Sequence, residues 1–339
     1  MPRMKKRTRT PAWSRVFQRS MAAFTRSAMK SGTQAWGAAL KPPLPKRTPP
    51  PCAGTWMPGV TMGSMGARRF RLYRPPGLKV SERLPLLVML HGCGQDANSF
   101  AASTRMNRVA LRERFLVLYP EQDRLANAHG CWNWFDTASG RAQGEAALIM
   151  KAIDQVCLLH PVDRARVAIA GLSAGASMAA LLVTRHPGRF KAVVMHSGIP
   201  PGTAHSGLTA LGAMHGRRAT RPLRAASPLT AADSWPPLLV IHGDADAVVS
   251  PHNSQAAAQV WADAAGARAV APRKVQRGQR YPMSVTDFKS RGCTVATLVE
   301  VGRLAHAWSG GAANTPFSDA QGPDASRMVW AFAARQFRV

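Results

Sequence analysis

The sequence predicts an α/β fold with a mainly parallel central sheet that helices cover on both faces. Three observations support this prediction. From residue 67 onward, short apolar segments bounded by turn residues alternate with longer segments of helical periodicity, the pattern of parallel strands joined by helices. The apolar segments are continuous, as expected for strands buried on both faces. The length of 339 residues and the apolar fraction of 46% allow one large domain with a sizeable core.

The expected strands are seven apolar segments: RRFRLYRP (68–75), PLLVMLHG (85–92), FLVLYPE (115–121), VAIAGLS (167–173), AVVMHSG (192–198), PLLVIHGDAD (237–246) and TVATLVEVG (294–302). The expected helices are GEAALIMKAIDQVCLLH (144–160), SQAAAQVWADAAG (254–266) and ASRMVWAFAARQF (325–337). Residues 201–236 break this alternation and are long for a connecting loop. We therefore expect a small lid or cap insertion there.

The N-terminal region differs from the rest in charge and composition. The formal net charge of the chain is +28, and 17 Lys or Arg residues precede the first acidic residue, Glu82. We predict a basic, amphipathic helical tail at 1–40, a stiff proline-rich linker at 41–66 and the folded domain at 67–339. A basic surface attracts polyanions whatever the fold. Two interpretations of the tail stay open: contact with an anionic surface or granule, and a solvated tail without a partner.

Metal sites, membrane spans and export signals are not legible in the sequence. The five cysteines include no CxxC pair and no close histidine spacing, so no metal site is predicted. The longest apolar runs fall far short of the roughly 20 residues that cross a bilayer. Basic residues interrupt any apolar core of an export signal, which favours a cytoplasmic location. No specific nucleic-acid site is predicted either.

The segment VAIAGLSAGASMAALL (167–182) predicts a strand that turns sharply into a helix with one hydroxyl at the apex. The G-x-S-x-G spacing alone is a weak signal, but a strand before it and helix formers after it are typical of a nucleophile elbow. Gly171 and Gly175 allow close backbone packing, while Ser173 occupies a strained conformation that exposes its hydroxyl. The N-terminus of the following helix can stabilise developing negative charge. Ser173 is therefore the predicted nucleophile.

A nucleophilic serine needs a base, and the base needs an orienting carboxylate. In elbow architectures the chain order is serine, acid, histidine. The strand PLLVIHGDAD ends in Asp244 and Asp246, and the only histidines after it are His252 and His306. His252 is expected to begin the next helix, whereas His306 lies in a glycine-flanked loop after the last strand. We assign His306 as the base and Asp246 as the acid, with Asp244 as a turn residue.

An attack on an ester carbonyl creates an oxyanion, and each donor that stabilises it is worth about 3 kcal/mol. One donor is expected to be the backbone amide of Ala174, next to the nucleophile. The other is expected in PLLVMLHGCGQDANSF (85–100), where a glycine-rich turn follows an apolar strand. We assign this second donor to the amide of Cys93 and treat His91 as a structural residue of the turn.

Six motifs occur in order along the chain: HGCGQDANSF, YPEQ, CWNWF, GLSAGASMA, HGDAD and HAWSGG. Together they resemble the esterases of the polyhydroxybutyrate (PHB) depolymerase family, which have the α/β-hydrolase fold and are similar to feruloyl and acetylxylan esterases. The resemblance covers residues 67–335. It implies the same roles for Ser173, Asp246 and His306, and hydrolysis of a carboxylic ester through an acyl-enzyme without a cofactor.

The resemblance leaves the substrate open. Poly(3-hydroxybutyrate) or hydroxyalkanoate oligomers are the expected substrates, and feruloyl or acetyl esters of carbohydrates are the alternative. A non-catalytic protein that binds a granule or polyanion is the alternative of another class, and the complete Ser, Asp and His set argues against it. The family's depolymerases of solid polymer carry an export signal and a substrate-binding domain, and neither is legible here. The family nevertheless points to an extracellular location, with the cytoplasm as the alternative.

Further residues of these motifs have two interpretations each. Trp132, Trp134 and Trp308 are expected to line an apolar substrate cleft. Core packing is the alternative for Trp132 and Trp134, and Trp308 is the better candidate for the rim. Cys93 and Cys131 lie in motifs expected to converge near the site, so they form either a disulfide or two buried thiols, depending on the compartment.

Overall fold

The structure, a computed structural model, describes residues 52–79, 81–224 and 235–338. The predicted tail at 1–40, the first part of the predicted linker and residues 225–234 of the predicted lid lie outside the described residues. Among the helices of the described ranges, none combines the length and the apolar character that crossing a bilayer requires.

Eleven strands within the described ranges form one sheet in the order β1-β2-β4-β3-β5-β6-β7-β11-β10-β8, and β9 pairs with β10. The strands are β1 (Thr55–Gly63), β2 (Gly66–Arg74), β3 (Leu84–Leu90), β4 (Leu116–Pro120), β5 (Val162–Leu172), β6 (Ala192–His196), β7 (Leu238–Gly243), β8 (Arg268–Ala269), β9 (Arg273–Val275), β10 (Met283–Ser290) and β11 (Cys293–Val301). The strands from β4 to β11 in this order run parallel. Antiparallel pairs extend the sheet at both edges.

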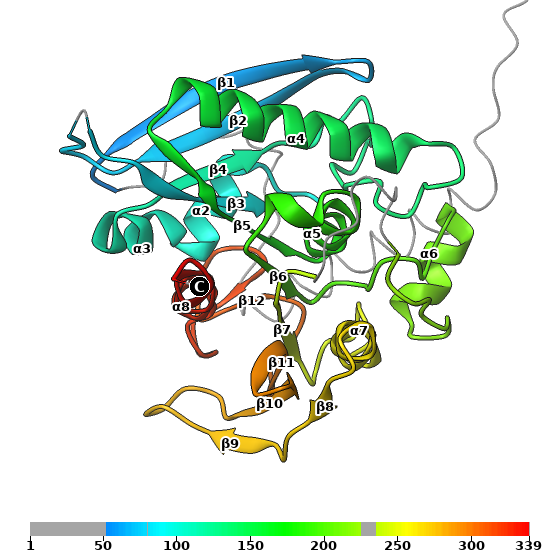
Figure 1. Ribbon diagram of the computed structural model, residues 1–339. Coiled ribbons are helices and arrows are strands. Elements are labelled where there is room, and N and C mark those ends of the chain that lie inside the picture. The colour runs from blue at the N-terminus through cyan, green and yellow to red at the C-terminus, as the bar shows by residue number, and fades with distance from the viewer. Residues whose placement is uncertain (1–51, 80, 225–234, 339) are drawn as a thin grey trace, which may run out of the picture.

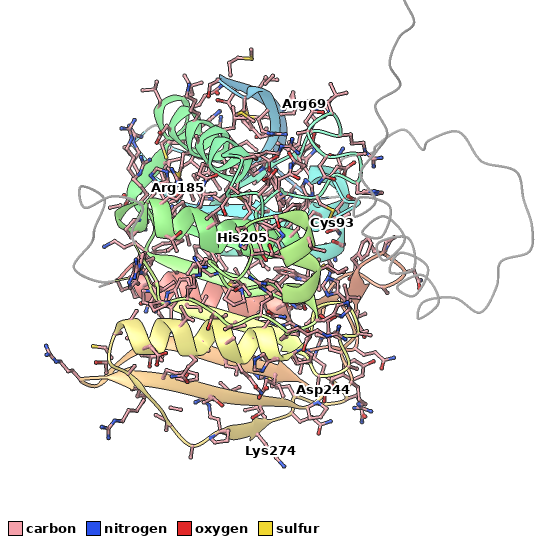
Figure 2. All side chains as sticks on the ribbon, turned by 90° about the vertical axis from the view of Figure 1, so that its right-hand side faces the viewer. Arg69, Cys93, Arg185, His205, Asp244 and Lys274 are labelled. Atoms are coloured by element: carbon pink, nitrogen blue, oxygen red, sulfur yellow. A yellow bond between two sulfur atoms is a disulfide. The ribbon has the colours of Figure 1, made fainter. Side chains whose placement is uncertain are left out.

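Helices cover both faces of the sheet (Figure 1). On one face lie α4 (Arg141–Leu159), α5 (Ala174–Arg185) and α7 (His252–Ala264), and on the other lie α2 (Ala97–Thr104), α3 (Met106–Glu113) and α8 (Ala325–Gln336). Side chains alternate between the two cores along β7: Leu238 and Val240 join the first, Leu239 and Ile241 the second. Side chains fill the spaces between the layers (Figure 2). The predicted α/β fold with a mainly parallel sheet is confirmed.

The predicted segments correspond to β2 to β7, β11, α4, α7 and α8. Smaller elements complete the described part of the chain: a 3₁₀ turn (Pro187–Arg189), α6 (Gly207–Met214) and the short parallel pair β12 (Trp308–Ser309) and β13 (Ser318–Asp319). Helix α6 lies within the segment predicted to be a lid. At the far edge, β8, β9 and β10 form an antiparallel extension that the sequence did not predict.

The predicted linker at 41–66 extends too far, because residues 55–63 belong to the sheet. Strand β1 pairs with β2 along its whole length, from Thr55 opposite Arg74 to Gly63 opposite Gly66. Strand β1 was not predicted from the sequence because it contains a proline and two glycines, which are uncommon in strands. A proline is tolerated in an edge strand, and the ring of Phe70 covers Gly59 so closely that a Cβ there would lie 2.1 Å from it.

Candidate active site

The predicted site residues meet at one edge of the parallel sheet. Ser173 directly follows β5, Asp246 follows β7, and His306 lies in the loop after β11. The strands β5, β6, β7 and β11 are parallel neighbours. Because the carboxyl ends of parallel strands point to the same edge, loops distant in sequence converge there.

Ser173 occupies a tight turn between β5 and α5. Its backbone has φ 55° and ψ −120°, a conformation that costs a non-glycine residue about 1–3 kcal/mol. A Cβ on Gly171 would lie 2.3 Å from the backbone of Gly175, and a Cβ on Gly175 would lie 2.2 Å from the carbonyl oxygen of Leu90. Only glycine fits at either position, so the G-x-S-x-G pattern follows from the close approach of β3, β5 and α5.

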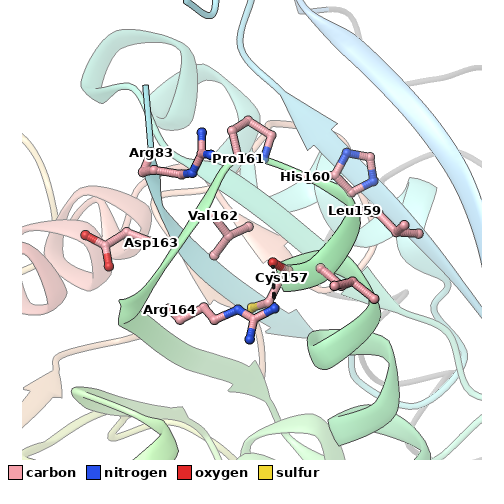
Figure 3. A pocket seen from close by; sticks show the side chains of 9 residues that line it. Arg83, Cys157, Leu159, His160, Pro161, Val162, Asp163 and Arg164 are labelled. Carbon is pink, nitrogen blue, oxygen red and sulfur yellow. Dashed lines mark hydrogen bonds between the residues drawn. The ribbon is translucent and has the colours of Figure 1, made fainter. Parts of the chain in front are cut away.

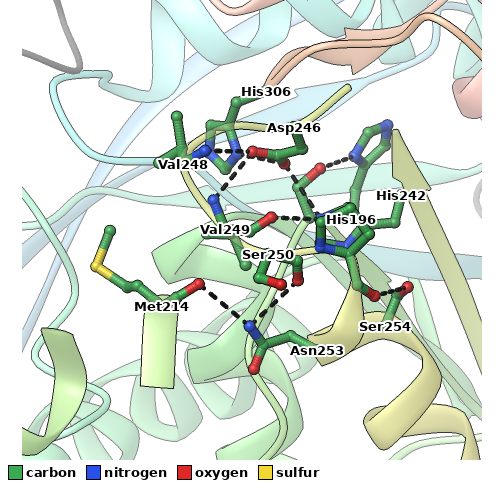
Figure 4. A network of polar contacts seen from close by, with 12 residues as sticks. His196, Met214, His242, Asp246, Val248, Val249, Ser250, Asn253, Ser254 and His306 are labelled. Carbon is green, nitrogen blue, oxygen red and sulfur yellow. Dashed lines mark hydrogen bonds and ion pairs between the residues drawn. The ribbon is translucent and has the colours of Figure 1, made fainter. Parts of the chain in front are cut away.

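Asp246 and His306 form a buried hydrogen bond (Figure 4). Nδ1 of His306 lies 2.7 Å from Oδ2 of Asp246. The other carboxylate oxygen, Oδ1, accepts hydrogen bonds from the amides of Val248 and Val249, each at 2.9 Å. These two amides fix the carboxylate, and the carboxylate in turn orients the ring of His306.

The electrostatic setting keeps Asp246 ionised. Burial opposes ionisation, but the neighbouring His306 and His242 outweigh it and hold the pKa of the Asp246 carboxyl well below its usual range. The carboxylate is therefore negatively charged at neutral pH and can stabilise a proton on His306.

A second histidine shares the same carboxylate oxygen. Nε2 of His242 lies 3.2 Å from Oδ2 of Asp246 and 2.9 Å from the carbonyl oxygen of Val249, and the His242 side chain is 1% exposed. Because a carbonyl can only accept, Nε2 of His242 carries a proton, which is directed between these two oxygens. The carboxylate of Asp246 therefore accepts hydrogen bonds from two backbone amides and two imidazole rings.

His196 connects the elbow to the loop that carries His306. The carbonyl oxygen of His196 accepts the amide of Ser173 at 2.8 Å, and its Nε2 accepts the amide of Ser309 at 3.1 Å. Burial, together with the nearby His242 and His306, lowers the pKa of His196 to about 3. The ring is therefore neutral and able to accept at Nε2.

His196 and His242 were not among the predicted site residues. Each stands at the end of an apolar strand, in AVVMH and LLVIHG. A polar residue at the carboxyl end of a buried parallel strand lies at the same edge as the other site residues. This position is the signal by which the sequence could have identified both.

Cys93 and Ala174, the predicted oxyanion donors, both line a small hollow that Ser173 also lines. In the loop that carries Cys93, the amide of Gly92 donates to the side chain of Gln95 at 3.0 Å. The amide of Gly94 donates to a backbone carbonyl at 2.9 Å. Both neighbours are thus engaged within the protein, which leaves the amide of Cys93 as the candidate donor of this turn.

A disulfide joins Cys93 to Cys131, and thereby ties the loop of Cys93 to the CWNWF segment. Of the two predicted alternatives, the structure has the disulfide. The bond spans 38 residues, and a loop of this length corresponds to about 4 kcal/mol of stabilisation in a chain-entropy description. Cys52, Cys157 and Cys293 are free thiols.

The CWNWF segment rests on a buried polar network. The carboxylate of Glu145, which is 1% exposed, accepts the side-chain amide of Gln122 at 2.7 Å. It also accepts the backbone amide of Asn133 at 2.9 Å and its side-chain amide at 2.6 Å. The indole of Trp132 donates to the carbonyl oxygen of His91 at 3.1 Å. These bonds hold the segment against the turn that carries Cys93 and strengthen one another in a low-dielectric interior.

The hollow that Ser173 lines is apolar and carries no charged side chain. Its other lining residues are Cys93, Cys131, Trp132, Trp134, Phe135, Ala174, Ser177, Ile199, Ala210, Met214, Val248 and Val249. It encloses about 30 Å³. Helix α6 supplies Ala210 and Met214, so part of the segment predicted to be a lid forms a wall of this hollow.

The three tryptophans do not share one position. Trp132 and Trp134 line the hollow, and they are also packed into the core at 0% and 9% exposure. Trp308 is 0% exposed, with its ring 5.0 Å from that of His196 and 5.6 Å from that of Phe100. The prediction that Trp308 lies at the rim is wrong, because its ring fills the second core beneath the site.

The alternative acid and base occupy the positions that the sequence indicated. Asp244 is exposed, and its Oδ1 accepts the amide of Arg303 at 2.7 Å. It therefore stabilises a turn, although its partner is a neighbouring loop and not its own backbone. His252 is exposed and begins α7.

A larger hollow of about 730 Å³ lies at the opposite end of β5, where residues 157–164 connect α4 to β5 (Figure 3). Its charged groups are engaged: Arg164 donates to the carbonyl oxygen of Cys157 at 3.4 Å, and Asp163 pairs with Arg166 at 2.6 Å. Burial raises the pKa of the Cys157 thiol, which keeps it in the unreactive protonated form. We therefore place the site at Ser173 in spite of the smaller hollow there.

Comparison with known proteins links this geometry to ester hydrolases. A family model described as esterase PHB depolymerase matches residues 68–276. Poly(3-hydroxyalkanoate) depolymerase C of Paucimonas lemoignei is 37% identical over 117 residues, which are 34% of this chain and 28% of the relative. Acetylxylan esterase A of Emericella nidulans is 25% identical over 219 residues, which are 61% of this chain and 70% of that enzyme.

Among solved structures, the acetyl xylan esterase from Aspergillus awamori superposes with a TM-score of 0.63 at 18% identity. The match covers 75% of this chain and 94% of that one. At this identity the likeness shows a shared fold. The match to depolymerase C, by contrast, spans only 28% of that relative's length.

The close packing of the elbow predicts the effect of adding one methyl group. Gly175→Ala places a Cβ 2.2 Å from the carbonyl oxygen of Leu90, so we expect a loss of about 1–3 kcal/mol in the free energy of unfolding. Gly188→Ala is the control, because a Cβ there meets no atom within 4 Å. Urea unfolding measures both, and equal stabilities of the two variants would refute the packing argument.

The buried histidines predict how stability depends on pH. Burial lowers the pKa of His91 to about 4 and that of His196 to about 3, whereas both protonate near pH 6.5 in an unfolded chain. The unfolded state then binds more protons as the pH falls. The free energy of unfolding should stay level above about pH 6.5 and fall below it by about 1.4 kcal/mol per pH unit for each histidine.

Urea unfolding between about pH 7.5 and pH 4.5 measures this slope. His91→Gln is expected to remove its share of the slope. A His91→Gln variant with the slope of the original chain would contradict the prediction.

Proposed function

The chain belongs to the esterase PHB depolymerase family, and from this premise we propose that it is a serine esterase that hydrolyses carboxylic esters. Its fold is that of the α/β-hydrolases. In this proposal Ser173 is the nucleophile, His306 the general base and Asp246 the acid that orients the base. The observation that carries it is the buried 2.7 Å contact between Asp246 and His306 at the sheet edge that also holds Ser173.

In the first half of the reaction, Oγ of Ser173 attacks the ester carbonyl carbon while its proton passes to Nε2 of His306. Nδ1 of that ring faces Asp246, so Nε2 is the nitrogen that takes the proton, and the carboxylate stabilises the imidazolium. The amides of Cys93 and Ala174 stabilise the oxyanion by about 3 kcal/mol each. The bond between the acyl carbon and the alkoxide oxygen then breaks, and His306 gives its proton to that oxygen, which leaves as the alcohol.

In the second half, a water molecule attacks the acyl-enzyme. His306 takes one proton from the water as the new carbon–oxygen bond forms, and the same two amides stabilise the second oxyanion. The bond between the acyl carbon and Ser173 then breaks, and the proton on His306 returns to Oγ. The products are one alcohol and one carboxylic acid, and the enzyme regains its initial state.

The hollow beside Ser173 supports a short, uncharged acyl group as the substrate. Its walls are apolar and it encloses about 30 Å³, so a long acyl chain has no room to be buried there. A 3-hydroxybutyryl unit is short and uncharged, so its carbons can contact these walls while the rest of an oligomer extends outward from the ester oxygen. We therefore propose hydroxyalkanoate oligomers as substrates, which agrees with the name of the Paucimonas lemoignei relative.

Acetyl esters of carbohydrates are the second candidate. An acetyl group is smaller still, and the Emericella nidulans relative is named an acetylxylan esterase. A feruloyl group, with its rigid aromatic ring, fits the small hollow less well. The relative rates on hydroxybutyrate oligomers, acetylated xylan and feruloylated sugars distinguish the three.

The disulfide supports a location outside the reducing cytoplasm. Disulfides persist in oxidising compartments, and the bond between Cys93 and Cys131 ties together two motifs that border the proposed oxyanion site. We therefore favour an extracellular location. Contact of the basic tail at 1–40 with an anionic surface or granule is an additional part of this proposal, and its support is the charge of the sequence.

Replacement of the proposed nucleophile tests the mechanism. Ser173→Ala is expected to lower kcat for short p-nitrophenyl esters and 3-hydroxybutyrate oligomers on the order of 10⁵-fold or more, since it removes the group proposed to form the acyl-enzyme. Ser81→Ala is the control, because it removes an exposed hydroxyl that does not line the hollow and should keep the activity. Substantial hydrolysis by a pure Ser173→Ala protein would exclude the mechanism.

His242 is expected to act as a positioning residue for Asp246. In His242→Ala one donor to Oδ2 of Asp246 is lost, so the carboxylate holds a proton on His306 more firmly. The acidic limb of the profile of kcat/KM against pH should then move to higher pH. A side-chain amide can also donate, so His242→Gln should restore part of the original profile. A uniformly lower rate with an unshifted profile would indicate a structural role only.

A further inference from the structure

A groove is lined by apolar residues and arginines of α8, β9, β10 and neighbouring elements. Figure 1 shows α8 at one side of the sheet and β9 and β10 at its far end. The volume of the groove is about 620 Å³, within the range of roughly 300–1,000 Å³ that is typical of sites for small molecules. The floor consists of apolar side chains, among them Leu239, Val275, Met283, Val285, Val299 and Phe332.

The rim of this groove is strongly basic. Six guanidinium groups line it, and Glu113 is the one acidic residue among the lining residues. The six are Arg112, Arg273, Arg277, Arg327, Arg335 and Arg338. Three of them have an acidic partner, namely Glu113, Asp287 and Asp324. In the part of the chain that the structure describes, no ion pair engages the other three.

The groove is separate from the site at Ser173. Leu239 and Thr297 line it, and they face each other across β7 and β11 near the amino end of β7. Asp246, by contrast, follows the carboxyl end of β7. The groove also lies on the face of the sheet that α8 covers, where Leu239 joins the second core. The hollow at Ser173 is on the other face.

Ordinary structural roles account for single arginines but not for the groove. Arg335 stands in the last turn of α8, where a cation complements the helix dipole. Basic residues on β9 protect a short edge strand from pairing with other chains, and Lys274 projects at this end of the molecule (Figure 2). Neither role explains why apolar side chains and six arginines line the same groove.

The charge of the groove disfavours two occupants that this chain could supply. Residues 1–51 contain 12 Lys or Arg and no acidic residue, so the tail is repelled. A second copy carries a formal net charge of +28 and is repelled for the same reason. An anion with an apolar part complements both the arginines and the apolar floor. A guanidinium pairs with a carboxylate through two parallel hydrogen bonds.

We propose that this groove binds an amphiphilic carboxylate, with the carboxylate on the arginines and the apolar chain along the floor. The choice of a carboxylate rests on the proposed function, because each cleavage of a hydroxyalkanoate oligomer leaves a carboxylate on a fragment whose remaining chain is uncharged. The groove would then hold a released acid, or the acid end of an oligomer, away from the site where its ester bond is cleaved.

The test uses the full chain and decanoate as the probe, with binding measured by equilibrium dialysis. Decyltrimethylammonium, of equal chain length and opposite charge, is the control ligand. The groove variant is Arg277→Gln with Arg335→Gln, two exposed residues. The control variant is Arg268→Gln with Lys289→Gln, which removes the same charge from paired residues on β8 and β10 that do not line the groove.

Decanoate should bind the original chain and the control variant with equal Kd, and the groove variant at least about tenfold more weakly, as expected for the loss of a charge-assisted contact. Decyltrimethylammonium should not bind measurably. An equal loss in the two variants, or no loss in either, would overturn the proposal. Hydrolysis of a short p-nitrophenyl ester, measured in parallel, should be unchanged in both variants. Decanoate binding without any hydrolysis would refute the esterase function and leave the groove intact.

Discussion

The close approach of three backbone segments at Ser173 determines the positions of the other groups at this edge of the sheet. Strand β5 must turn into α5 with the backbones of Gly171 and Gly175 in contact, while Gly175 also touches the end of β3 at Leu90. The strained conformation of Ser173 persists because packing on all sides determines it. The same contact places the turn that carries Cys93 beside the start of α5, so nucleophile and candidate oxyanion donors share one constraint.

The acid end of the site is built differently, from hydrogen bonds instead of backbone packing. Asp246 receives two amides on one oxygen and two imidazoles on the other, which leaves its carboxylate little freedom. His196 connects the turn at Ser173 to the loop that carries His306. Its carbonyl oxygen accepts the amide of Ser173, and its Nε2 accepts the amide of Ser309. A neutral, buried histidine suits this task, since its Nε2 can accept while its ring packs on Trp308.

The sequence predicted those parts of the fold and the site that depend on a local pattern of residues. Apolar strands that end in Ser173 or Asp246 are legible because strand, turn and helix each have a local signal. His242 stands at the end of the same strand, four residues before Asp246. That both His242 and His306 meet one carboxylate oxygen depends on the alignment of β7 with β11, which no local pattern contains. Strand β1 was not predicted because Gly59 has no side chain to mark a strand. In the structure the ring of Phe70, on the neighbouring strand, covers this position. The burial of Trp308 was not predicted because its ring contacts Phe100, His196 and Ser326, which are all distant in sequence.

The most direct test of the central claim is covalent labelling of the full chain with a fluorophosphonate, followed by digestion and mass spectrometry. A serine activated by His306 should form one phosphonyl adduct, on the peptide that contains Ser173. The adduct should be absent in Ser173→Ala and form far more slowly in His306→Ala. A label on another serine such as Ser177, or no label on a protein that still hydrolyses esters, would contradict the account.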